Sequence, residues 1–118
     1  MAHTEHARQV FEEEASHGFD QRLRGVRGTF RFDVIDVGSW HVAIDDGRVA
    51  IREGAGAPAE CVVEGPESDL VAILTGELRA IIAFMQGRVR LRGDMALFTR
   101  FHGWAGSEGG AQPMAEQP

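Results

Sequence analysis

The segment GTFRFDVIDVGSWHVAIDDGRVAIR, residues 28–52, carries the clearest structural pattern in the chain. Apolar and polar residues alternate through three short runs, which is the pattern of β-strands with one buried face. Gly38-Ser39 separates the first two runs, and Asp46-Gly47, a strong signal for a two-residue hairpin turn, separates the last two. The segment therefore predicts three antiparallel strands, and other elements must cover their shared apolar face.

The flanking segments predict those covering elements. Residues 5–17 have the 3.6-residue period of a helix, and a fourth strand is predicted at 59–64. The remaining elements are a helix that begins near Pro66, a helix over 78–85, a fifth strand over 88–92 and a last helix with the apolar stripe Leu97, Phe98, Phe101 and Trp104. The 78–85 helix is apolar on almost every side, so we expect it to be buried or to line a cavity.

Length and charge limit the classes of function. The 118 residues fit one domain, predicted over 1–104, and residues 105–118, rich in Gly, Pro, Glu and Gln, are predicted to be a disordered tail. The formal net charge of −6 argues against nucleic-acid binding, because phosphate contacts need a basic footprint. The apolar run at 80–85 is too short to cross a membrane.

Cysteine usage and the first residues predict the compartment. The single cysteine, Cys61, cannot form an intrachain disulfide, and its apolar run predicts a buried thiol that behaves as a small hydrophobe. Residues 1–8 are polar and lack the apolar core of a signal peptide. We therefore expect a cytoplasmic protein. All twelve basic residues are Arg, a bias that suggests a bacterial genome rich in GC.

Three motifs, in this order and spacing, resemble the sterol carrier protein 2 (SCP2) family. The first is Gly38-Ser39-Trp40 with an alternating strand that ends at Asp46-Gly47, and the second is the joint Leu74-Thr75-Gly76-Glu77-Leu78. The third is AFMQGRVRLRGD, residues 83–94. Each motif alone is common, whereas their combination is specific, and the resemblance covers residues 28–104.

The resemblance implies an α+β fold. Its expected form is a five-stranded, mostly antiparallel sheet with helices covering one face and an apolar tunnel between the sheet and the helices. A lipid of the fatty acid, acyl-CoA, sterol or isoprenoid quinone type is the implied ligand, and its transfer or presentation is the implied use. The resemblance implies a stand-alone bacterial member without a cofactor, a bound metal or enzymatic activity.

Helical phase and the resemblance together give the expected site. The residues expected to line the tunnel are Leu74, Leu78, Ile81, Ile82, Phe84, Met85, Leu97, Phe98, Phe101 and Trp104. Polar side chains beside them are candidates for contact with a lipid head group, namely His102, Arg88 and Arg90. Arg88, Arg90 and Arg92 also fit a simpler role, since charged side chains on an edge strand oppose edge-to-edge pairing.

Two other classes of function are weighed against lipid binding. An interaction module without a ligand, such as a homodimer, would bury the apolar 78–85 helix in an interface. A small isomerase-like enzyme would use an Asp base with a Tyr as oxyanion donor, but the chain has no Tyr. The sequence assigns no role to Asp36, which is in phase with the apolar row of the first strand, or to His41, which lies on the polar face of the second.

Overall fold

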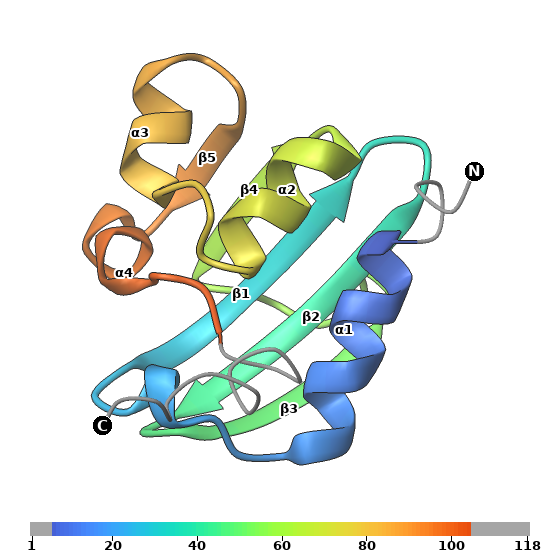
Figure 1. Ribbon diagram of the computed structural model, residues 1–118, viewed down its shortest axis with the longest axis vertical. Coiled ribbons are helices and arrows are strands. Elements are labelled where there is room, and N and C mark those ends of the chain that lie inside the picture. The colour runs from blue at the N-terminus through green and yellow to red at the C-terminus, as the bar shows by residue number, and fades with distance from the viewer. Residues whose placement is uncertain (1–5, 105–118) are drawn as a thin grey trace, which may run out of the picture.

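A five-stranded sheet forms the centre of the protein in the computed structural model, which describes residues 6–104 (Figure 1). The strands lie in the order β3-β2-β1-β4-β5, and β1 pairs in parallel with β4 while every other pair is antiparallel. Their bounds are β1 Arg27–Val34, β2 Gly38–Asp45, β3 Arg48–Glu53, β4 Cys61–Gly65 and β5 Arg90–Gly93. The predicted α+β fold and its mostly antiparallel sheet are confirmed.

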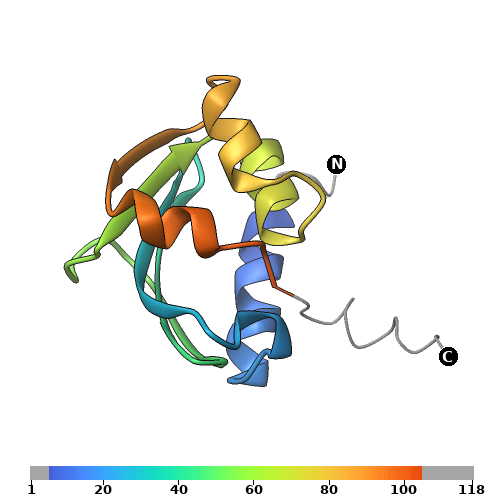
Figure 2. The same ribbon diagram turned by 90° about the vertical axis from the view of Figure 1, so that its left-hand side faces the viewer.

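The helices cover one face of this sheet (Figure 2). α1 lies along β2 and β3, and α2, α3 and α4 lie over the other half (Figure 1). Their bounds are α1 His6–His17, α2 Glu67–Leu74, α3 Ala80–Met85 and α4 Met95–Arg100, with a 3₁₀ turn η2 at Gln21–Leu23. The predicted tail, 105–118, lies outside the described residues. Over 6–104, the longest helix has 12 residues, and no helix is both long and apolar enough to span a bilayer.

Strand alternation orients the sheet as the sequence predicts. Phe30, Phe32 and Val34 of β1 are buried toward the helices, beside Trp40 and Val42 of β2. Asp36 departs from its expected place in this apolar row. It lies in the β1–β2 turn with a φ of 65° and an exposed side chain. The strand ends at Val34, so the alternation of buried and exposed residues does not extend to Asp36.

Aromatic rings fill the space between the sheet and the helices. Phe11 of α1 stacks on Trp40 at 4.6 Å between ring centroids and meets Trp104 edge-on at 5.8 Å. Phe101 lies 5.1 Å from Phe30 across the same layer. Such pairs stabilise by about 0.5–1.5 kcal/mol each beyond their buried area, so this cluster holds the helices to the sheet.

The last helix is shorter than predicted. Asp94 caps its start by accepting a hydrogen bond from the amide of Leu97 at 3.0 Å, as expected for a Gly-Asp turn. The helix ends at Arg100, and Phe101 and Trp104 reach the core from an irregular segment that follows. The prediction of one helical stripe from Leu97 to Trp104 was therefore wrong, although all four of its residues are buried.

Gly103 allows the segment after this helix to lie against the end of α2. Its φ of 80° is in the left-handed region, and a Cβ on it would lie 2.7 Å from the amide nitrogen of Gly76 and 2.7 Å from the carbonyl oxygen of Ile73. Beside it, the amide of Trp104 donates to the carbonyl of Leu74 at 2.8 Å. The segment 101–104 is thus pressed directly onto the end of α2.

Burial keeps Cys61 protonated. The side chain is fully buried in β4, and desolvation, with a smaller contribution from the nearby Asp94 carboxylate, raises the pKa of its thiol to about 12. This shift favours the neutral thiol, and the predicted burial of Cys61 is confirmed.

Replacing Gly103 by alanine is expected to lower the free energy of unfolding by about 1–3 kcal/mol, because both the backbone conformation and the contact with residues 73–76 exclude a methyl group. Gly56→Ala is the matched control, since a Cβ there meets nothing within 4 Å. Urea denaturation of both variants measures the difference. Equal stability of the two would contradict the close approach.

The pKa of Cys61 gives a second prediction. The unfolded thiol ionises near its ordinary value of 9.0 and the folded one at about 12, so the stability contributed by the neutral thiol is lost as pH rises through this window. The slope is at most about 1.4 kcal/mol per pH unit. The sequence contains no Tyr and no Lys, so no other side chain titrates there. Denaturation between pH 9 and pH 12 should show the loss in the wild type and not in Cys61→Ala.

Candidate functional site

The residues expected to line a tunnel divide into two groups in the structure. Leu74, Leu97, Phe98, Phe101 and Trp104 are buried in the core. Leu78, Ile81, Ile82 and Phe84 are only partly buried, and Met85 is 73% exposed. The first group belongs to the packed layer between the sheet and the helices, and the second lies at its outer margin, on or beside α3.

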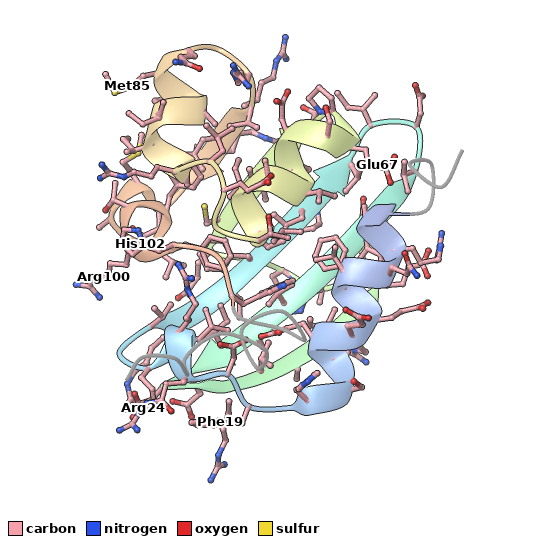
Figure 3. The ribbon with its side chains drawn as sticks, viewed as in Figure 1. Phe19, Arg24, Glu67, Met85, Arg100 and His102 are labelled. Atoms are coloured by element: carbon pink, nitrogen blue, oxygen red, sulfur yellow. The ribbon has the colours of Figure 1, made fainter. Side chains whose placement is uncertain are left out.

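The burial of α3 is the reverse of what its side chains would favour. Its two small residues, Ala80 and Ala83, face the core, while Ile81, Ile82 and Phe84 are only partly buried. Met85 points away from the body of the protein at the end of the helix (Figure 3). The expectation of a helix buried on every side is therefore wrong for its outer half, because α3 packs through its smallest side chains. We call Ile81, Ile82, Phe84 and Met85 the α3 rim.

The rim continues onto the neighbouring elements. Phe84 meets the buried Phe98 of α4 edge-on, with ring centroids 6.2 Å apart. Met95 at the start of α4 is 41% exposed, and Leu91 of β5 is partly buried against the core. An apolar surface thus extends from the outside of α3, past Phe84, to the core side chains of α4.

The structure separates the three residues expected near a head group. Arg88, in the loop after α3, forms an ion pair with Asp69 at 3.2 Å. Arg90 pairs in register with Glu64 on the face of the sheet opposite the helices. His102 is exposed beyond α4, where its carbonyl accepts a hydrogen bond from Arg22 at 3.0 Å (Figure 3). Of the three, only Arg88 and His102 border the helical layer.

The sequence pattern placed Glu14 in the apolar row of the first helix but assigned it no functional role. Glu14 of α1 is completely buried, and it falls at the i+7 position of the apolar row that begins with Ala7. That position was the available signal, because an acid in phase with an apolar stripe faces the core. Over residues 6–104, no three His, Cys, Asp or Glu side chains gather closely enough to hold a metal ion.

Sequence comparison matches most of the chain to one family. The model described as the SCP-2 sterol transfer family matches residues 8–105. Sterol carrier protein 2 of Bos taurus is 29% identical over 83 residues, which are 66% of this chain and 15% of that protein. Stomatin-like protein 1 of Mus musculus is 47% identical over 51 residues, 43% of this chain and 12% of the mouse protein. The match thus spans a small part of each of these longer relatives.

Solved structures share the fold. The sterol carrier protein domain 2 of Helicoverpa armigera superposes with a TM-score of 0.58 at 23% identity, over 78% of this chain and 76% of that one. Sterol carrier protein 2 of Aedes aegypti, solved in complex with the C16 fatty acid palmitate, gives 0.56 at 23% identity over 78% and 86%. By its sequence match over residues 8–105, with its fold in agreement, the chain belongs to the SCP-2 sterol transfer family.

Proposed function

We propose that this protein binds a lipid between its sheet and the helices α2, α3 and α4, with the α3 rim as the entrance. The observation that carries the proposal is the orientation of α3, which buries two alanines, leaves its larger apolar side chains only partly buried and exposes Met85. Removing apolar surface from water stabilises by about 25 cal/mol for each Å² buried. An apolar ligand that enters beside α3 would cover this surface.

Lipid binding needs enclosed apolar surface and no catalytic group. Each methylene transferred from water contributes about 0.8 kcal/mol, so a chain of ~16 carbons offers on the order of 10 kcal/mol before the costs of association and ordering. Phe84 and Met85 suit such a role, because an aromatic ring offers a large contact area and methionine adapts to irregular shapes. We therefore propose a binding protein that performs no reaction of its own.

The segment 101–104 is the part of the core that would make room for the ligand. It is irregular and places Phe101 and Trp104 in the aromatic layer. Its backbone joins the end of α2 through the bond from Trp104 to Leu74. A small shift of this segment would open a path from the α3 rim to the rings over β1 without unfolding any helix.

The family and its relatives support this proposal. The description of the family names sterol transfer, and the structure of the Aedes aegypti relative was solved in complex with palmitate. We propose a ligand of the fatty acid, acyl-CoA, sterol or isoprenoid quinone type. Its chain would contact the residues Leu74, Leu78, Ile81, Ile82, Phe84, Met85, Leu97, Phe98, Phe101 and Trp104. His102 and Arg88 are the proposed contacts of its polar end, since both border the helical layer.

Uptake of a fluorescent C18 fatty acid tests the proposal. Ile81→Glu and Phe84→Glu place a carboxylate at the entrance, where its desolvation opposes an apolar chain, and each should weaken binding about tenfold or more. Ile35→Glu is the matched control, because Ile35 is 48% exposed in the β1–β2 turn, away from the rim. Circular dichroism must show that all three variants keep the native fold.

Native mass spectrometry provides the opposing outcome. If added fatty acid, acyl-CoA, sterol and quinone all fail to bind, the lipid proposal is wrong. A dimer that Ile81→Glu converts to a monomer would then identify the α3 rim as a contact between copies of the chain. Equal binding by the wild type and both rim variants would show that a lipid enters somewhere else.

A further inference from the structure

The face of the sheet opposite the helices carries a row of basic side chains. Strand register places Arg52 beside His41, His41 beside Arg31, and Arg31 beside Val62, which in turn pairs with Arg92. Each of these residues lies next to one that is buried or partly buried against the core, so the row lies on the open face, which the helices leave uncovered (Figure 2). A chain with a net charge of −6 thus concentrates cations along one line.

A glycine-rich connection crosses this face. We call residues 54–60, which join β3 to β4, the strap. At one end the amide of Gly54 donates to the carbonyl of Ser39 at 2.8 Å, and at the other the amide of Glu60 donates to the carbonyl of Thr29 at 3.1 Å. In between, the carbonyl of Pro58 lies 3.0 Å from Nε2 of His41. Because a carbonyl only accepts, Nε2 of His41 carries the proton and donates it.

A hollow of about 370 Å³ lies between the strap and the strands. Its walls are His41 and Arg52 on the sheet, Glu53 at the end of β3, and the strap residues Gly54, Gly56 and Ala57. A Cβ on Gly54 or Gly56 would meet nothing within 4 Å, so the strap presents bare backbone to the hollow. The amides of Gly56 and Ala57 make no backbone hydrogen bond within residues 6–104.

The charges around the hollow leave one cation uncompensated. The carboxylate of Glu53 binds Arg8 of α1 at 2.7 Å, which offsets its charge. Arg31 is held by Asp33 through two hydrogen bonds of 2.9 and 3.0 Å. Partial burial acts to raise the pKa of Asp33, but the bonds from Arg31 and Ser39 outweigh it and hold that pKa below its ordinary value, so this pair stays charged. Arg52 has no acidic partner in the described part of the chain.

We propose that this hollow binds a phosphate group. A guanidinium matches phosphate with a planar fork of N–H donors, and successive backbone amides in a glycine-rich turn supply further donors without steric obstruction. Arg52 provides the fork, the strap at Gly56 and Ala57 provides the amides, and His41 ties the strap to the sheet. The site lies on the opposite side of the sheet from the proposed lipid site, so the two proposals stand or fall separately.

Titration with inorganic phosphate, followed by ¹H–¹⁵N NMR at constant ionic strength, tests the site. We expect saturable shifts at residues 52–57 and at the ring of His41. Arg52→Gln should weaken the affinity about tenfold, because it removes a charge-assisted contact. Arg100→Gln is the matched control, since Arg100 is an exposed arginine on α4 that points away from the protein on the helical side (Figure 3), and it should bind phosphate like the wild type.

Two further probes identify the carrier of the phosphate. Binding of glycerol 3-phosphate, without retention on phosphatidylcholine vesicles that contain phosphatidic acid, would assign the site to a soluble phosphate ester. Retention on those vesicles that Arg52→Gln abolishes, with none on pure phosphatidylcholine, would assign it to a lipid head group. Shifts that do not saturate, or that are unchanged in Arg52→Gln, would overturn the proposal.

Discussion

Parallel pairing between β1 and β4 governs where the later elements lie. β3 ends beside Trp40, at the end of the sheet where β1 also ends, whereas β4 begins beside Phe30. A parallel partner therefore requires the chain to travel back along the sheet. The strap does so over the open face in seven residues, 54–60, and leaves the helical face to α1 through α4. Both candidate sites follow from this single crossing, one under the strap and the other among the helices.

The two sites differ in how they are held. Strand register fixes Arg52 and His41 on a rigid sheet, and the strap is bonded to that sheet at both ends. The α3 rim instead belongs to a short helix that packs through two alanines. The segment 101–104, which supplies Phe101 and Trp104, follows α4 without regular secondary structure. A preformed polar hollow suits a small anion, while the packed apolar layer would have to rearrange to admit a ligand.

The parts of the fold that could be predicted are those set by local period. Alternation over residues 28–52 gave the three-stranded meander, and Asp94 marked the start of α4 correctly. Phe101 and Trp104 continued the helical phase, so sequence alone could not reveal that the chain leaves the helix at Phe101. A helix apolar all round likewise contains no signal for which face is buried. The far end of the basic row was beyond prediction, because Arg92 joins it through the pairing of β1 with β4, which are distant in sequence.

The aromatic layer also determines the tryptophan fluorescence of the protein. The chain contains two tryptophans, Trp40 and Trp104, and both are buried in ring contact with Phe11. Arg8 lies over the ring of Trp40, with its guanidinium carbon 5.3 Å from the ring centroid. All tryptophan fluorescence of the native protein therefore originates from one spot between α1, β2 and the segment 101–104. The wavelength of that emission depends on how much water reaches the two indole rings. Tryptophan fluorescence is therefore an intrinsic probe of the layer between the sheet and the helices.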